Sequence, residues 1–163
     1  GDWDAVEDLV PEATACYLAA SDAYTRMGKY ALAGTIYAEL AGHLAAVHRR
    51  EDAAVYYQRA AELTETESPQ VAGACLRHAI DHRVACGDYA GALECVEPAI
   101  CVLEREPCVA PWRAVPATSA CARSEVARLT LTQALLHALL SDFPASRRSL
   151  EALSAHASAH GTP

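Results

Sequence analysis

Small and apolar residues recur along the chain at the three- and four-residue spacing of α-helices, and helix-breaking residues divide this pattern into segments of about twenty residues. Gly28 and Gly87 are expected to end helices, because glycine readily adopts the left-handed backbone conformation found there. Pro11 is expected at the first position of a helix, where proline is tolerated. The segments predict seven helices and no strands, over residues 11–27, 30–48, 51–64, 69–86, 89–105, 119–140 and 144–157.

The remaining corners are expected near Arg49, Ser68 and Asp142. Residues 106–118 contain three prolines, and no helix is expected to cross them. These prolines are Pro107, Pro111 and Pro116. The pattern therefore predicts one helical domain over residues 1–163, interrupted by a proline-containing loop at about 106–118.

Three of the expected helices share a register of alanine and tyrosine. The matching stretches are Gly28-x-Tyr30-x-x-Ala33, Ala53-x-x-x-Tyr57 and Gly87-x-Tyr89-x-x-Ala92. They resemble the helix corner of a tetratricopeptide repeat, in which glycine ends one helix, tyrosine packs in the corner and alanines let the helices touch. In the preceding helix, Tyr17, Ala20, Tyr24 and Met27 fit the packing positions of such repeats.

The spacing between equivalent alanines predicts unusually long helices. Ala53 and Ala92 are 39 residues apart, against about 34 in the usual tetratricopeptide repeat. The pattern predicts an all-α, tetratricopeptide-like solenoid of about seven antiparallel helices, with Ala33, Ala53 and Ala92 buried at helix contacts. A generic helix bundle, with the same residues in its core, is the alternative.

Three stretches resemble the family of the forty-kilodalton huntingtin-associated protein, also called the factor VIII intron protein. They are Tyr57-Gln58-Arg59-Ala60-Ala61-Glu62-Leu63, Asp88-Tyr89-Ala90-Gly91-Ala92-Leu93 and Ser124-Glu125-Val126-Ala127-Arg128-Leu129. The resemblance covers roughly residues 12–140, and it implies a protein that holds the helical-repeat arms of huntingtin together and is linked to Rab5-dependent endosome traffic. The loop at 106–118 is much shorter than the proline-rich loop of that family.

A second resemblance is to the soluble attachment proteins that recruit the NSF ATPase to SNARE complexes. It rests on Glu12-Ala13, Cys16 and Tyr24-Thr25-x-Met27-Gly28. It implies a SNARE coiled coil and a hexameric ATPase as partners. Another tetratricopeptide-like scaffold is the third possibility.

Composition and charge exclude several classes of function. The net charge is −8, and Lys29 is the only lysine, so the basic stripe that a nucleic-acid-binding protein needs is absent. No apolar run reaches the length of a membrane span, and the acidic start of the chain does not resemble a signal peptide. Seven cysteines at irregular spacing are expected to be reduced and largely buried. We therefore expect a cytoplasmic protein, with endosomal association or a nuclear location as alternatives.

Motifs for chemistry are weak. Cys75, His78, His82 and Cys86 share one side of an expected helix, but a single helix cannot surround a zinc ion, and Cys86 is expected in the core. The sequence contains no glycine-rich phosphate loop and no nucleophile elbow. We expect no catalytic residue, no metal and no cofactor, and hence no enzyme.

Other residues are candidates for contact with a protein partner. Tryptophan outside a helix has no core to fill and is enriched at interfaces, and arginine pairs at corners can bind a partner's carboxylates, although most are simply exposed. The expected interface residues are Trp3, Arg49, Arg50, Trp112, Arg147 and Arg148. Folding of Trp112 back onto the helices is the alternative for that residue. The ends of the expected solenoid lack clear capping helices, so we expect them to need a partner. If the complex is obligate, its interface should bury more than about 2,000 Å² of total surface.

Overall fold

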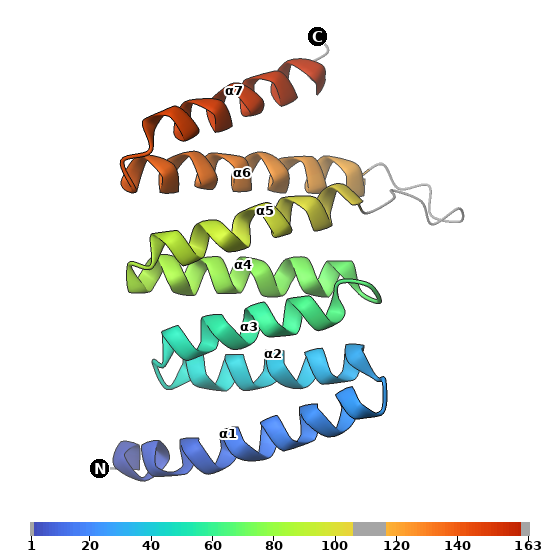
Figure 1. The fold of residues 1–163 in the computed structure, drawn as a ribbon, viewed down its shortest axis with the longest axis vertical. Helices are drawn as coiled ribbons and strands as arrows, with labels where there is room; N and C mark the ends of the chain where they lie inside the picture. The colour runs from blue at the N-terminus through green and yellow to red at the C-terminus, as the bar shows by residue number, and fades with distance from the viewer. Residues whose placement is uncertain (1, 106–116, 161–163) are drawn as a thin grey trace.

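Seven helices form an antiparallel stack in the structure, a computed structural model (Figure 1). It describes the backbone of residues 2–105 and 117–160, with side chains over 9–104 and 123–155 and at residue 158. The helices are α1 Asp2–Arg26, α2 Tyr30–Ala46, α3 Arg50–Thr64, α4 Pro69–Cys86, α5 Tyr89–Arg105, α6 Ala117–Leu139 and α7 Phe143–His160. The predicted all-α solenoid is confirmed: within the described residues all regular secondary structure is helical.

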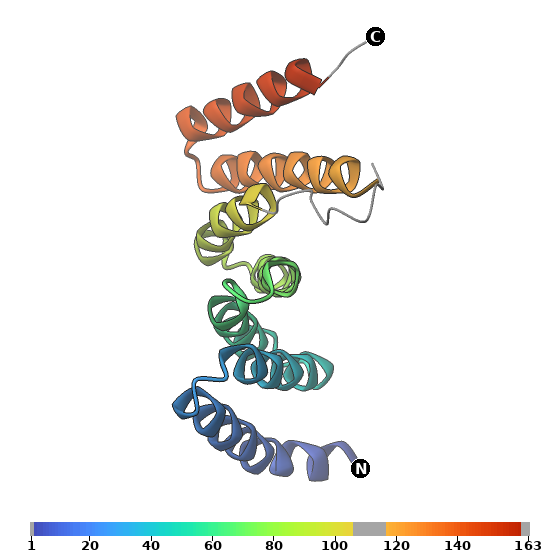
Figure 2. The same cartoon turned by 90° about the vertical axis from the view of Figure 1, so that its right-hand side faces the viewer.

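Each helix packs mainly against its neighbours in the sequence, which is the contact pattern of a solenoid. Figure 2 shows α3 and α5 on one side of the stack and α2, α4 and α6 on the other. The N-terminal end of α1 and the C-terminal end of α7 both curve toward the side of α2, α4 and α6 (Figure 2). We call that side the concave face.

Four of the corners have the same backbone geometry. One residue adopts a positive φ, and the next donates its N–H to a carbonyl five residues back, satisfying an otherwise unpaired helix end. The residues with positive φ are Gly28 (72°), His48 (63°), Gly87 (79°) and Ser141 (61°). The bonds are Lys29 N to Tyr24 O, Arg49 N to Leu44 O, Asp88 N to Arg83 O and Asp142 N to His137 O, at 2.8–2.9 Å. The corners predicted at Gly28, Arg49, Gly87 and Asp142 are confirmed.

The start of α1 differs from the prediction. The helix begins at Asp2, and Pro11 lies inside it rather than at its first position. Residues 2–10 contain neither glycine nor proline, and acidic residues in the first turn interact favourably with the helix dipole. Trp3 therefore lies in a helix, not in an irregular segment, and the reason for expecting it at an interface is lost.

The predicted loop is shorter at its C-terminal side, because α6 already begins at Ala117. The prediction for the prolines and for Trp112 falls on residues 106–116, outside the described residues.

The core is built from small residues, as predicted. Ala33, Ala53 and Ala92 are each 0% exposed at helix contacts. Gly34 on α2 allows still closer approach, since a Cβ there would lie only 3.0 Å from the carbonyl oxygen of Ala60 on α3. Backbones can come this close only where side chains are small, so the alanine register sets the tight stacking of α2 on α3.

Some of the predicted packing is wrong. Met27 is 62% exposed and Tyr30 is 46% exposed, because they flank the corner between α1 and α2, at helix ends that the neighbouring helices do not cover. Cys86 is exposed as well. The five described cysteines are free thiols, but only Cys75 and Cys95 are buried. No described helix is both long enough and apolar enough to span a bilayer.

Candidate protein-interaction surface

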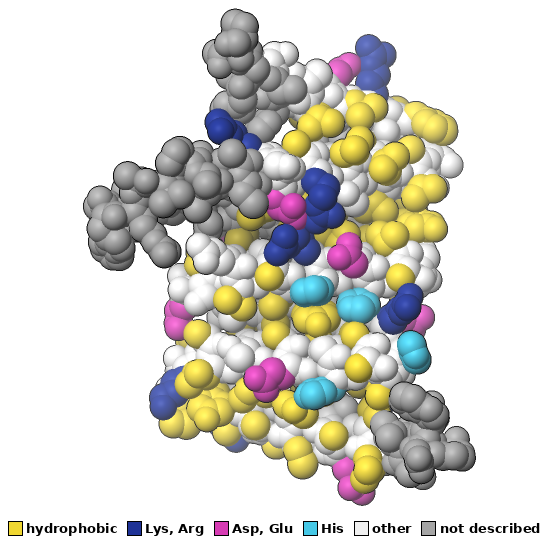
Figure 3. Space-filling model, turned by 180° about the vertical axis from the view of Figure 1, so that it is seen from behind, with side chains coloured by type: hydrophobic (Ala, Val, Ile, Leu, Met, Phe, Trp, Pro, Cys, Tyr) yellow, Lys and Arg dark blue, Asp and Glu magenta, His cyan; other side chains and the backbone are white. Residues whose placement is uncertain are grey.

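A ring cluster on the concave face joins α3 to α4. Tyr57 of α3 stacks on His78 and His82 of α4, with ring centroids 5.0 and 5.7 Å away and interplanar angles of 26° and 6°. The two histidines meet the same ring because residues four apart lie on one side of a helix. Figure 3 shows histidine side chains gathered in the middle of this face.

Burial alters the acid–base properties of the ring cluster. Burial first, and then the charges of His78 and Arg50, lower the pKa of His82 below its usual value, against a smaller opposing effect of Asp81. Burial, followed by the neighbouring Cys75, raises the pKa of Tyr57. His82 is therefore held as a neutral ring at neutral pH, the form that stacks without repelling Arg50.

An ion network on the same face joins α4 to α6. Glu125 accepts hydrogen bonds from Arg128 at 2.7 Å and from Arg77 at 3.2 Å. The hydrogen bond from Arg128, and then the smaller effects of its charge and of Arg77, lower the pKa of Glu125 despite partial burial. Arg77 and Arg128 keep about half of their side chains exposed, so their guanidinium groups remain accessible beside the ring cluster.

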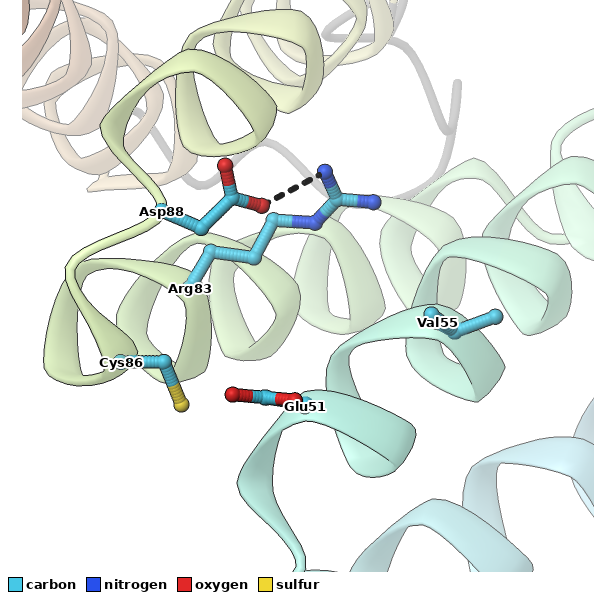
Figure 4. Close-up of a pocket in the computed structure, with 5 residues that line it drawn as sticks. All are labelled: Glu51, Val55, Arg83, Cys86 and Asp88. Atoms are coloured by element: carbon cyan, nitrogen blue, oxygen red, sulfur yellow. Dashed lines mark hydrogen bonds and ion pairs between the residues drawn. The ribbon is translucent and has the colours of Figure 1, made fainter.

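A cavity of about 330 Å³ lies where α3 meets the corner between α4 and α5 (Figure 4). It is lined by Glu51, Val55, Arg83, Cys86 and Asp88. Arg83 bonds Asp88 at 3.4 Å, and Asp88 caps α5 by accepting a bond of 2.9 Å from the N–H of Gly91. These charged groups already hold the corner together, and the thiol of Cys86 projects toward the carboxylate of Glu51. A cysteine nucleophile is commonly activated by a histidine, and none of the residues that line the cavity is a histidine.

An apolar groove of about 350 Å³ runs between α1 and α2. Its lining combines aliphatic side chains with the tilted ring pair of Tyr17 and His43, whose centroids are 5.7 Å apart. The residues are Leu9, Val10, Ala13, Thr14, Tyr17, Leu40, His43, Leu44, Ala46 and Val47. Besides the ring cluster, the groove offers an apolar surface for contact with a partner near the N-terminal end of the stack.

The structure does not bring the predicted arginine pairs together. Arg49 and Arg50 lie at the corner between α2 and α3, and Arg147 and Arg148 lie at the start of α7. All are at the same edge of the stack, but the corner between α4 and α5 separates them (Figure 1).

Two of these arginines pair with carboxylates three or four residues further along the chain. Arg49 pairs with Asp52 at 2.6 Å and Arg147 pairs with Glu151 at 2.9 Å. The groups are exposed, so these pairs contribute little stability and can be exchanged for a partner's carboxylates.

The residues weighed as metal ligands do not converge. Cys75 is buried, Cys86 is exposed, and His78 and His82 face Tyr57. Among the described residues, no group of three or more His, Cys, Asp or Glu side chains has a geometry that could hold an ion. The spacing of the histidines was a visible signal, but their contact with Tyr57 depends on how α3 packs on α4 and is missed by sequence reasoning.

These features define a class: a curved helical-repeat scaffold whose accessible faces suit contact with other proteins. The model of the family described as "Soluble NSF attachment protein, SNAP" matches residues 6–103. The chain therefore belongs to the soluble NSF attachment protein family. No curated protein matches the sequence.

A solved structure with a similar fold is that of BtubC (BKLC) from P. vanneervenii. It has 17% sequence identity and a TM-score of 0.53, and the match covers 100% of this chain and 78% of that chain. At this identity the similarity shows the fold alone.

Proposed function

We propose that the chain is a non-catalytic adaptor that binds and stabilises huntingtin through its concave face, with a role in endosome traffic. The observation that carries the binding role is the cluster of stacked rings and half-exposed arginines on the concave face, formed by Tyr57, His78, His82, Arg77 and Arg128. Tyrosine and arginine side chains are enriched among the residues that contribute most to protein interfaces.

The choice of huntingtin rests on the stretches that resemble its associated protein. Their residues have defined structural roles: Ala60, Ala61 and Ala92 are buried, and Asp88 caps α5. The resemblance thus lies in the residues that set corner geometry and helix contact, which supports a shared architecture and, through it, a shared partner.

The chain's charge adds a requirement on that partner. A net charge of −8 favours association with basic surfaces, mainly through the rate of encounter. We propose that the acidic surface outside the arginine cluster meets basic patches of a larger solenoid in the cytoplasm.

The second candidate is an adaptor for SNARE complex disassembly by NSF. The observation that favours it is the family match over residues 6–103, which covers α2 to α4 and most of α1 and α5. On this proposal the concave face holds a SNARE coiled coil instead of a huntingtin arm.

Co-expression with huntingtin from the same source tests the first proposal, and an NSF disassembly assay with SNARE complexes tests the second. A stable complex that survives gel filtration, together with no effect on disassembly, is expected. A chain that ignores huntingtin and accelerates disassembly would move the assignment to the second candidate. Failure in both assays would overturn both partners.

A further inference from the structure

On the concave side of the stack, the exposed surface of α6 differs from the exposed surfaces of α2 and α4. It carries leucines at four-residue intervals: Leu131, Leu135 and Leu139 are 44%, 57% and 60% exposed. The exposed positions of α2 and α4 are mostly small or polar, and their exposed large apolar side chains do not form a run at four-residue intervals: these are Tyr30 and Leu32 on α2 and Val71 and Val84 on α4. The repeat architecture alone therefore does not account for the leucines of α6.

The apolar surface continues over the corner into α7. Leu140, Phe143 and Leu150 are 43%, 67% and 46% exposed. Figure 3 shows hydrophobic side chains gathered over α6 and α7. We call the six residues the leucine patch: Leu131, Leu135, Leu139, Leu140, Phe143 and Leu150. Contiguous apolar surface of this kind marks an interaction site on a soluble protein.

Charge indicates what covers the patch. Residues 123–155 contain four arginines and only three acidic residues, whereas the whole chain has a net charge of −8. The excess negative charge thus lies entirely outside this part of the molecule. Two copies of an acidic chain repel each other least where this segment of one meets the same segment of the other.

We propose that the leucine patch is the interface of a homodimer. An interface between two identical surfaces must be self-complementary across a twofold axis. A stripe of three leucines at equal spacing meets this condition when two α6 helices pack antiparallel: Leu135 faces its own mate, and Leu131 faces Leu139 of the second copy. The rim of the interface has little net charge and contains both arginines and carboxylates, such as Arg147 and Glu151. An arginine of one copy can therefore pair with a carboxylate of the other across the twofold axis.

The inference does not depend on the partner under Proposed function, because it concerns the isolated chain and residues beyond the family match at 6–103. Sedimentation velocity of the full chain, from about 1 μM to about 1 mM, covers the range in which weak homodimers form. A concentration-dependent shift from monomer to dimer is expected. A monomer over the whole range would overturn the proposal.

A matched pair of variants locates the interface. Leu135 on α6 and Val55 on α3 are both 57% exposed, so Leu135→Glu and Val55→Glu place the same charge at equally exposed aliphatic positions. Leu135→Glu should abolish the dimer, because two glutamates would face each other at the axis, and Val55→Glu should leave it intact. Equal effects of the two variants, in either direction, would contradict the assignment of the interface to α6.

Two further measurements show whether the variants are folded and whether Leu135 lies at the twofold axis. Circular dichroism establishes that both glutamate variants keep their helices, and Leu139→Glu replaces Leu135→Glu if the latter unfolds. Mild oxidation of Leu135→Cys should yield more covalent dimer than the parent chain, which already has exposed thiols at Cys16 and Cys86. No gain over the parent would exclude Leu135 from the twofold axis.

Discussion

Arg83, near the end of α4, donates a hydrogen bond of 2.6 Å to Oε1 of Gln58 in the middle of α3. The same guanidinium bonds the carboxylate of Asp88, and only 15% of the Arg83 side chain is exposed. Gln58 also accepts a weak bond of 3.7 Å from the Cys95 thiol on α5. A partly buried polar group thus links three successive helices of the stack, and its loss would leave Gln58 without its main donor.

Replacing Arg83 with Met should destabilise the chain by about 1–3 kcal/mol, because a partly buried acceptor loses its partner. Arg59→Met is the control: Arg59 bonds Glu62 at 2.8 Å, but both side chains are at least half exposed. That change should cost less than about 1 kcal/mol. Urea denaturation of the two variants measures the difference, and equal midpoints would show that the link contributes nothing.

Ala92→Leu should also destabilise, by about 1–3 kcal/mol, because Ala92 is fully buried and a larger side chain overpacks its surroundings. Ala90→Leu, two residues earlier at an exposed position of α5, should change the free energy of unfolding little. Thermal melts that treat the two substitutions alike would contradict the alanine register.

Two helical glycines should respond to alanine in opposite directions. A Cβ on Gly34 would meet the Ala60 carbonyl at 3.0 Å and crowd Thr64, so Gly34→Ala should lower the melting temperature. A Cβ on Gly73 would meet Val102 and Leu103 at ordinary contact distances of 3.7 and 3.9 Å. Gly73→Ala should therefore stabilise by about 0.5–1 kcal/mol through helix propensity. A Gly34→Ala variant as stable as Gly73→Ala would show that α2 and α3 are not so closely packed.

His82 predicts a loss of stability in mild acid. Its pKa is lowered in the folded chain, so below about pH 6.5 the unfolded state binds more protons than the folded state. The free energy of unfolding should fall as the pH decreases through that value and on toward the lower folded pKa. His82→Gln should reduce this slope, and urea titrations at several pH values measure it. An unchanged slope in the variant would mean that His82 is not the group responsible.

Local signals predicted most of the fold. Gly28 and Gly87 marked corners because glycine accepts a positive φ, whereas His48 and Ser141 adopt the same conformation without any comparable signal. The buried alanines followed from their common register. Met27 and Tyr30 satisfied that register too, yet they are exposed, because register does not reveal how far a neighbouring helix covers the residues beside a corner.

The candidate site was less predictable. The helical spacing of His78 and His82 was visible, but their stacking on Tyr57 requires knowledge of which side of α3 meets α4. The sequence does not distinguish the leucines of the leucine patch from leucines of the core. Leu135 is 57% exposed, whereas the adjacent Leu136 is 2% exposed. Only the orientation of α6 in the stack separates these two roles.

The central claim is that the concave face binds the partner protein. Ala85 and Ala90 are both exposed and lie on either side of the corner between α4 and α5. Ala85 belongs to α4, which lies on the concave side of the stack, whereas Ala90 belongs to α5, which lies on the opposite side (Figure 2).

The direct measurement is the affinity of purified huntingtin for Ala85→Arg and Ala90→Arg, determined by calorimetry. Ala85→Arg should weaken binding at least about tenfold, equivalent to about 1.4 kcal/mol, while Ala90→Arg binds as the unmodified chain does. Unchanged binding by Ala85→Arg, or a loss confined to Ala90→Arg, would contradict the claim.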